Sequence, residues 1–231
     1  MGKKEAVKGI FNDIAPHYDR LNHFLSFNID KSWRKKAIAC IGKRNEESLI
    51  LDVACGTGDF AIAAAGAGAG KIIGVDIAEN MVEIGRRKVK EKGLEDRVTL
   101  ACGDSEQLAF DAYTFDAVTV AFGVRNFEHL EKGLTEMYRV LKEGGQVIIL
   151  EFSMPERCPM KQLYTFYFRY ILPVLGGAVS GNKGAYTYLP ESVLIFPQGK
   201  EFLNVLTTCG FTDVSQKRLT FGIATLYIGY K

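Results

Sequence analysis

The sequence predicts an α/β fold with a mostly parallel, seven-stranded sheet and helices on both faces. Over residues 49–152, short apolar segments that suit buried strands alternate with longer segments that suit helices. This alternation is typical of parallel sheets, because each crossover helix returns the chain to the same edge of the sheet. The first apolar segment also runs into a glycine-rich turn and an alanine-rich helix. The chain has 231 residues, enough for one core, so we expect residues 1–231 to form a single domain.

Composition and charge narrow the class of protein. Hydrophobic residues make up 47% of the chain and charged residues 24%, which is ordinary for a soluble globular protein. A net charge of +2 does not favour nucleic-acid binding. The five cysteines form no Cys-x-x-Cys pair and the three histidines add no ligand pattern, so we expect no metal site and reduced thiols in the cytoplasm. We expect neither a signal peptide nor a membrane span, because no apolar run suits either.

Residues 1–45 precede the first strand and are expected to form a helical cap on the sheet. Lys4–Ile14 has apolar residues on one face, which suits a helix that Pro16 would end. Asp30 suits the N-cap of a second helix that continues to about Ile41. The cap could simply pack on the sheet or could close over an active site, and composition alone favours neither.

The stretch Leu49–Phe60 predicts a buried strand, a tight turn and the start of a helix. The turn at residues 56–58 has the sequence Gly-Thr-Gly. Glycine has no Cβ, so the backbone of this turn can approach a ligand closely. Asp52 precedes the turn and Asp59 follows it, which makes the turn acidic. Such a turn opposes a bound pyrophosphate and favours a ligand that carries positive charge.

A second apolar strand, Lys71–Asp76, ends in a carboxylate 18 residues after Gly58. An acid at this spacing normally binds ribose hydroxyls, so the two segments together indicate a nucleoside cofactor. The pattern Gly56-x-Gly58-x-x-Ala61 also matches the dinucleotide fingerprint in its Gly/Ala form. A nicotinamide-dependent oxidoreductase therefore stays open as an alternative.

The rest of the sheet follows the same pattern. Strands are predicted over residues 97–104, 115–122, 146–152, 213–219 and 223–230, and helices over residues 79–92, 127–141 and from residue 200. The last two strands form a hairpin, which places the final strand antiparallel. Four side chains stand at the carboxyl ends of predicted parallel strands: Asp52, Asp76, Asp104 and Phe122. Ligands bind at this edge of an open α/β sheet, so we expect one pocket there.

An insert over residues 154–199 interrupts the alternation before the last two strands. Its first part, Pro159–Leu175, is apolar and aromatic, and residues 176–184 form a glycine-rich loop. The apolar part predicts either a helix whose aromatic rings lie in the core, or a lid and apolar channel on the substrate side.

Several segments resemble the methyltransferases that act on quinone rings in menaquinone and ubiquinone biosynthesis. Residues 52–59 resemble the first motif of S-adenosylmethionine methyltransferases with a Rossmann-like sheet. The more specific segments are Tyr18-Asp19-x-x-Asn22-x-x-x-Ser26 with Trp33-Arg34, Phe122–Asn126, Arg139–Gly145, Leu150–Ser153, Tyr186–Ser192, Phe196-Pro197 and Leu219–Ala224. The resemblance covers almost the whole chain. Glu143 departs from it, because the family commonly has proline before this Gly-Gly pair.

The resemblance implies S-adenosylmethionine as the cofactor and an acidic turn that faces its methionine part. The implied cofactor-binding residues are Asp52, Gly56, Thr57, Gly58, Asp76, Met81, Asp104, Ser105 and Ala121. Asp104 would accept a hydrogen bond from the adenine amino group; the alternative is an N-cap for a helix from Ser105 onward, and we favour the cofactor role. Met81 would pack on the adenine or simply fill the core.

The resemblance further implies C-methylation of demethylmenaquinol to menaquinol, with a ubiquinone-precursor ring as the close alternative. Arg125 is the first catalytic candidate, because a guanidinium beside a ring oxygen would stabilise developing negative charge. It could instead only pair with a carboxylate that anchors its loop. Tyr18, Asn126, Asp19 and His23 are further candidates in the substrate site, and the sequence leaves the base that removes the ring proton open. A binding protein without activity also stays open, although it would not need the intact glycine turn and acids.

The expected partners are a prenylated quinol and, weakly, the surface of a membrane, with no nucleic acid and with oligomerisation left open. We expect a cytoplasmic protein that contacts the inner face of the membrane through Leu163–Leu175. Tyr164, Tyr167 and Tyr170 have the combination of ring and hydroxyl that suits such an interface.

Overall fold

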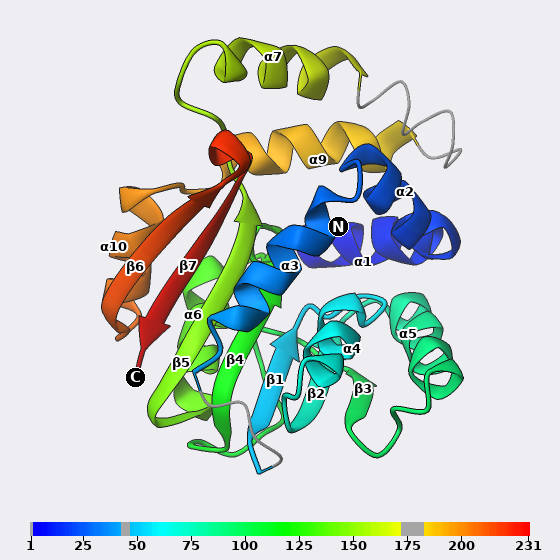
Figure 1. Cartoon of the computed structure of the whole chain (residues 1–231), viewed down its shortest axis with the longest axis vertical. Helices are drawn as coiled ribbons and strands as arrows, with labels where there is room; N and C mark the ends of the chain where they lie inside the picture. The colour runs from blue at the N-terminus through cyan, green and yellow to red at the C-terminus, as the bar shows by residue number, and fades with distance from the viewer. Residues whose placement is uncertain (1, 43–46, 172–182) are drawn as a thin grey trace.

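The computed structural model describes residues 2–42, 47–171 and 183–231, and their strands form a seven-stranded sheet with the order β3-β2-β1-β4-β5-β7-β6 (Figure 1). The strands are β1 (Leu49–Val53), β2 (Lys71–Asp76), β3 (Val98–Cys102), β4 (Phe115–Ala121), β5 (Leu141–Phe152), β6 (Thr212–Leu219) and β7 (Ala224–Tyr230). Strands β1 to β5 pair in parallel, and β7 lies antiparallel between β5 and β6. The predicted fold class is therefore confirmed, including the antiparallel last strand.

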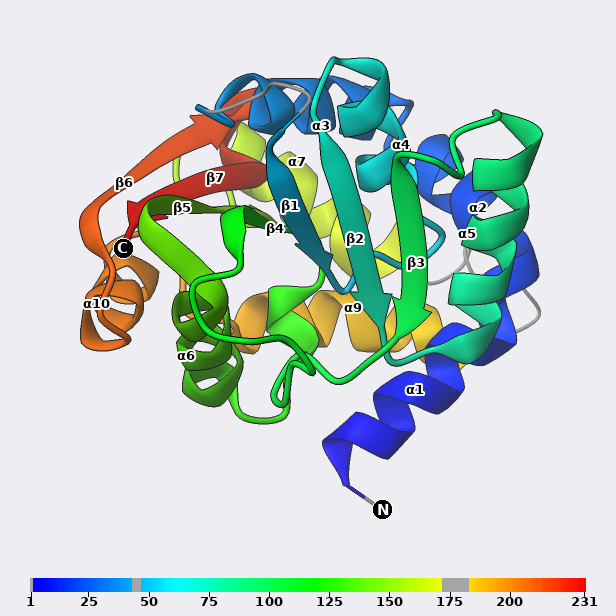
Figure 2. The ribbon, with the colours of Figure 1, turned by 90° about the horizontal axis from the view of Figure 1, so that it is seen from below.

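Helices cover both faces of the sheet (Figure 2). The described helices are α1 (Lys3–Ile14), α2 (Tyr18–Leu25), α3 (Ile29–Ala39), α4 (Asp59–Gly66), α5 (Glu79–Glu91), α6 (Leu130–Val140), α7 (Met160–Phe166), α9 (Lys183–Ile195) and α10 (Lys200–Thr208). Four short turns of helix join them: η1 (Ala15–His17), η2 (Val124–Asn126), η3 (Tyr167–Ile171) and η4 (Thr220–Gly222). One apolar layer holds side chains of α3, α4 and α5, and the layer on the opposite face holds side chains of α6 and α10.

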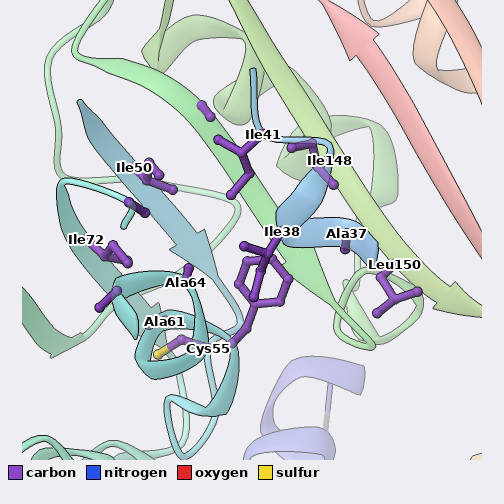
Figure 3. Packing of buried hydrophobic residues seen from close by; sticks show 14 of the residues in the cluster. Ala37, Ile38, Ile41, Ile50, Cys55, Ala61, Ala64, Ile72, Ile148 and Leu150 are labelled. Atoms are coloured by element: carbon purple, nitrogen blue, oxygen red, sulfur yellow. The ribbon is translucent and has the colours of Figure 1, made fainter. Parts of the chain in front are cut away.

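Helix α3 of the N-terminal cap is part of the main core. Its Ala37 and Ile38, together with Ile41 just beyond its end, are buried and pack with side chains of α4 and of the central strands (Figure 3). The α4 residues in this layer include Ala61 and Ala64, whose small side chains let the two helices lie close to the sheet. Helix α3 is consequently held firmly relative to the glycine turn that precedes α4.

The structure corrects two predictions in the cap. Asp30 does not cap α3: the helix begins at Ile29, and Asn28, with a left-handed φ of 59°, occupies the N-cap position. The Asp30 carboxylate instead accepts hydrogen bonds from Ser26 and Arg34 and contacts His23. The segment before it, which no periodicity marked as regular, forms the separate helix α2.

The structure also shifts two boundaries in the second half of the sheet. Helix α6 begins at Leu130 rather than near residue 127, and β5 begins at Leu141 rather than at residue 146. The early start of β5 arises because Leu141 pairs with Phe115 before an irregularity in the register, and Gly144 turns the chain with a φ of 71°.

The insert forms α7, a wide turn at η3 and α9, which contains Pro190. Of the predicted glycine loop, residues 176–182 lie outside the described residues, and the last two begin α9. Within the described parts of the chain, no helix is long and apolar enough to cross a membrane. Helices α1, α2 and α9 lie beyond the carboxyl ends of β1 and β4 (Figure 1), which is the edge where the sequence predicts a pocket.

Candidate active site

Three cavities share walls at this edge, and Tyr18 lines all of them. We name them the strand-end cavity, the turn cavity and the aromatic cavity, and define each below. Their empty volumes, counted out to their mouths, are about 700, 340 and 920 Å³. The buried position of Tyr18 raises the pKa of its hydroxyl above the ordinary value.

The strand-end cavity lies between the carboxyl ends of β2, β3 and β4 and the helix α1. Its walls include Asp76, Met81, Asp104, Ser105, Ala121 and Asn126, and its cover is made by Lys4, Val7 and Phe11 of α1. Gly56 also lines it, so the cavity brings together six residues that the sequence analysis assigned to the cofactor. Met81 is only 1% exposed and packs in a small apolar cluster with Leu21, so its predicted core role also holds.

Asp76 holds the glycine turn to the second strand. Its Oδ2 accepts a hydrogen bond from the Gly56 backbone N–H at 2.8 Å, and its Oδ1 accepts one from the Ala78 N–H at 2.8 Å. Burial raises the pKa of the Asp76 carboxyl, and these backbone bonds oppose the rise. A carboxylate has about four acceptor positions, so two bonds leave capacity for the hydroxyls of a ligand.

Asp104 is tied to the helix that covers the cavity. Its Oδ2 lies 2.8 Å from the Lys4 ammonium, and its Oδ1 accepts a hydrogen bond from the Glu106 N–H at 2.9 Å. Burial opposes ionisation of Asp104, but these contacts outweigh it, so the pKa of this carboxyl lies below its ordinary value. No helix begins at Ser105, and the alternative prediction of an N-cap there is wrong.

The turn cavity lies under the glycine turn and is lined by Tyr18, Arg34, Asp52, Gly56, Thr57 and Asp59, among others. Asp52 is 1% exposed. Its Oδ1 accepts a hydrogen bond from the Thr119 hydroxyl at 2.9 Å, whereas its buried Oδ2 has no hydrogen-bond partner among the described residues. Burial raises the pKa of Asp52 to about 7. An acid of this kind is stabilised by a cationic ligand that supplies the missing donor.

Backbone strain is concentrated beside this cavity. Ala54 and Phe122 follow the ends of β1 and β4, and both have a left-handed φ, 53° and 61°, that non-glycine residues rarely adopt. Gly56 has a φ of 54°, and a Cβ on Gly123 would lie 2.5 Å from the Cβ of Ala54. Glycine at position 123 therefore lets the two strand ends approach closely.

The acidity of the turn is smaller than the sequence suggests. Asp59 pairs with Lys88 of α5, and the same ammonium lies 2.7 Å from Asp19. The Thr57 hydroxyl donates to Asp19 at 2.5 Å, so these residues connect the turn to α2. Asp59 is charge-compensated, and the acid of the turn that retains an unpartnered oxygen is Asp52. Gly58 lines none of the three cavities; a Cβ there would lie 2.8 Å from Leu100.

The aromatic cavity is bounded by α2, α3, η3 and α9. Half of its lining residues are aromatic: Phe11, Tyr18, Trp33, Phe122, Phe152, Tyr164, Tyr167, Phe168 and Tyr188. The rings of Phe122 and Phe152 stack with centroids 4.4 Å apart, and Trp33 packs against both at 6.0 and 6.2 Å. Apolar and aromatic walls with few polar groups suit a planar apolar ligand.

The insert contributes to this cavity as well as to the core. Tyr164 and Phe168 are buried and stack with centroids 4.7 Å apart, yet both line the cavity. These rings thus lie both in the core and in a cavity wall, and the role of the insert as a lid and channel for substrate stays a prediction. Tyr164, however, is not available to a membrane surface, because it is only 7% exposed.

Arg125 lies in the wall of the aromatic cavity and forms a buried ion pair. Its Nη1 is 2.8 Å from Oε1 of Glu151, which is fully buried, and its Nε donates to Ser192 at 3.2 Å. Arg125 does pair with a carboxylate, as the alternative prediction supposed, but it also lines the cavity, so its catalytic role stays a prediction. Sequence reasoning missed Glu151, although an acid inside an otherwise apolar strand is a usable signal.

Of the remaining candidates, Asn126 lines a cavity, whereas His23 and Asp19 belong to ion pairs near the glycine turn. Asn126 lines the strand-end cavity and its Oδ1 accepts a hydrogen bond from Tyr188 at 3.1 Å. His23 lies between two carboxylates, 2.8 Å from Asp30 and 3.5 Å from Asp59. His23 and Asp19 thus belong to the ion pairs that surround the turn. Within the residues described, no group of three or more His, Cys, Asp or Glu side chains could hold a metal ion.

Comparison with known proteins agrees with this geometry. The chain is 50% identical over 230 residues to demethylmenaquinone methyltransferase of Bacteroides fragilis, covering 99% of this chain and 94% of that protein. It is 47% identical to the ubiquinone/menaquinone biosynthesis C-methyltransferase of Geobacter sulfurreducens, covering 99% and 90%. A solved structure from Thermotoga maritima, an S-adenosylmethionine-dependent methyltransferase described as a possible histamine N-methyltransferase, is similar to this chain with a TM-score of 0.69 and 20% identity. The match covers 96% of this chain and 98% of that one, and it confirms the fold. Residues 1–231 match the ubiE/COQ5 methyltransferase family throughout, and the chain belongs to that family.

Proposed function

We propose that this methyltransferase transfers a methyl group from S-adenosylmethionine to a ring carbon of demethylmenaquinol, giving menaquinol. The observation that carries the proposal is the meeting of three cavities at Tyr18: two at the glycine turn and strand ends, and one lined by aromatic rings. The relative from Bacteroides fragilis is named for this substrate. A ubiquinone-precursor ring is the second candidate, because the relative from Geobacter sulfurreducens is named for both quinones.

The residues at the turn and strand ends fit S-adenosylmethionine. The adenosine part would lie in the strand-end cavity, with its ribose hydroxyls on Asp76, its adenine near Asp104 and Ser105, and Met81 against the ring. The methionine part would lie along Gly56, Thr57 and Ala121, where the buried Oδ2 of Asp52 lacks a partner among the described residues. That oxygen suits the ammonium group of an amino acid. When bound, the cofactor supplies an electrophilic methyl group on a positively charged sulfur.

Methylation of a ring carbon requires an electron-rich ring, which removal of a hydroxyl proton provides. The rings of Trp33, Phe122 and Phe152 offer a flat apolar surface for the quinol. Arg125 would stabilise the negative charge that develops on a ring oxygen, since its pair with Glu151 holds the guanidinium in the cavity wall. Arginine stays protonated and is not the base. Tyr18 and Asn126 stay candidates for contact with the ring oxygen.

The prenyl tail of such a substrate places the reaction near a membrane. We propose a cytoplasmic protein that reversibly contacts the membrane surface through the outer side of α7 and η3. Leu163, Phe166 and Tyr170 are more than half exposed there. Lys161 and Arg169 add positive charge that anionic lipids attract. Tyr164 and Tyr167, by contrast, line the aromatic cavity.

A methyl-transfer assay tests the proposal. Purified protein, radiolabelled S-adenosylmethionine and demethylmenaquinol should give labelled menaquinol. A parallel reaction with a demethoxyubiquinol-type ring measures the second candidate under the same conditions. Labelling of the ubiquinone precursor alone would reassign the substrate, and labelling of neither ring would refute the proposed reaction.

A further inference from the structure

Arg34 occupies a position that neither the family name nor the cofactor assignment explains. It lies on α3, whose neighbouring residues Trp33, Ala37 and Ile38 are buried in the main core. The Arg34 side chain is only 11% exposed and lines both the turn cavity and the aromatic cavity. A buried guanidinium at the junction of two cavities requires acceptors, so its charged neighbours matter.

The carboxylates that face Arg34 also contact other basic side chains. Its Nη1 pairs with Asp30, and its Nη2 lies 4.0 Å from Asp59. Asp30 also contacts His23 at 2.8 Å, and Asp59 pairs with Lys88 of α5. Asp30 balances the Arg34 charge, but its contact with Nη1 engages only part of the guanidinium. A guanidinium has five N–H donors in a planar fork, and this fork matches the geometry of a carboxylate.

Arg34 and Asp52 place opposite charges on the wall of one small cavity. Burial raises the pKa of Asp52, and the positive charge of Arg34 is among the influences that oppose this rise, which agrees with the two side chains facing the same space. An α-amino acid carries an ammonium and a carboxylate on one carbon. A cavity with an unpartnered carboxylate oxygen and a cationic donor is complementary to both of its charges.

We propose that Arg34 binds the α-carboxylate of the methionine part of S-adenosylmethionine, opposite the ammonium group at Asp52. This inference rests on the proposed function and deepens it. Two-point binding of the amino acid fixes the direction of the chain that leads to the sulfur. Since Arg34 also lines the aromatic cavity, it thereby positions the sulfonium methyl group at the junction with the quinol site.

Binding of the demethylated product tests the proposal without turnover. Isothermal titration calorimetry would compare S-adenosylhomocysteine with its decarboxylated analogue, which keeps the ammonium and lacks only the carboxylate. The wild-type protein should bind S-adenosylhomocysteine about 10- to 100-fold more tightly. Arg34→Gln should lower that affinity by a similar factor and leave the affinity for the analogue unchanged. Lys35→Gln, an exposed cation on the same helix, is the matched control and should change neither.

Each other outcome has a distinct meaning. Equal affinity of the wild-type protein for both ligands would overturn the role of Arg34, and this comparison needs no variant to fold. Equal loss of affinity for both ligands in Arg34→Gln would show a structural role instead. Failure of S-adenosylhomocysteine to bind the wild-type protein would refute the proposed cofactor site itself. If Arg34→Gln kept its affinity for S-adenosylhomocysteine but had a raised KM for the quinol, Arg34 would be assigned to substrate binding instead.

Discussion

Ionisation of Asp52 costs free energy in the protein without cofactor, because its carboxylate is buried and one oxygen lacks a partner among the described residues. Its pKa of about 7 lies above the ordinary value of 3.8. Protonation therefore favours the folded state, and this contribution is fully present below pH 4 and is lost as the pH rises through 7. A cationic cofactor reverses the balance by stabilising the ionised form.

The Asp52→Asn variant should consequently be more stable than the wild-type protein at pH 8, by about 1–4 kcal/mol, and the difference should shrink towards pH 4. Denaturant unfolding of both proteins without cofactor at pH 4, 6 and 8 measures the difference, and other titrating groups largely cancel. The same substitution should weaken S-adenosylhomocysteine binding at pH 8. A stability difference that does not vary with pH would contradict the assignment.

Arg125 illustrates how one side chain can have structural and chemical roles together. Arg125→Ala should destabilise the protein by about 3–5 kcal/mol, because it leaves the fully buried Glu151 without its cation. The double variant Arg125→Met with Glu151→Gln removes both charges and should recover much of the stability, yet turnover should stay low and cofactor affinity nearly unchanged. Thermal unfolding, calorimetry and the methyl-transfer assay separate these effects. Recovery of turnover in the double variant would leave Arg125 a structural residue only.

At the scale of elements, α1 forms the cover of the strand-end cavity. Two lysines of α1 hold it to the site: Lys3 donates to the carbonyl of Phe127 at 2.6 Å, and Lys4 pairs with Asp104. The Lys4 ammonium therefore pairs with Asp104, the carboxylate that we propose binds adenine. We therefore expect the Lys4–Asp104 pair to couple movement of α1 to entry of the cofactor.

Lys4→Gln should accelerate both association and dissociation of S-adenosylhomocysteine by about fivefold, since one charge-assisted hydrogen bond to the cover is lost. Stopped-flow fluorescence with a fluorescent cofactor analogue measures both rates. Lys8→Gln is the control. Lys8 lies on α1 as Lys4 does, but it pairs with the exposed Glu79 of α5 and does not line the cavity. Equal rates in Lys4→Gln and the wild-type protein would show that α1 does not limit access.

At the scale of the whole molecule, the segment formed by α7 and η3 has apolar side chains on two sides. The outer side of α7 and η3 exposes Leu163, Phe166 and Tyr170, while the inner side lines the aromatic cavity. A prenylated substrate entering from a bilayer would meet this part of the molecule first. The apolar surface and the cavity thus lie on the two sides of the same short segment.

Leu163→Ser combined with Phe166→Ser should weaken association with anionic liposomes about tenfold or more, because two apolar side chains no longer enter the lipid. Sedimentation with liposomes, with and without demethylmenaquinol, measures the change. Tyr113→Ser is the matched control, since Tyr113 is 57% exposed and lies near the amino end of β4, away from the cavities. Equal binding by all three proteins would assign the membrane contact to another surface.

The sequence by itself determined the sheet, its parallel strands and the edge where the cavities lie. These features depend on local patterns: apolar segments such as Lys71–Asp76 can only be satisfied as buried strands, and a glycine turn between strand and helix sets the edge. The side chains that follow strands, such as Asp76 and Asp104, are consequently placed by counting along the chain. The motif containing Phe122–Asn126 added the catalytic candidate in the same way.

Tertiary structure alone decided which charges meet. Lys4 and Asp104 are 100 residues apart in the chain, and Lys88 reaches Asp59 from a different helix. Such pairs depend on how helices dock against the sheet, and apolar periodicity specifies the buried face of a helix but not its partner. For this reason the sequence overstated the acidity of the turn, and the position of Arg34 beside Asp52 emerged only when α3 packed against α4.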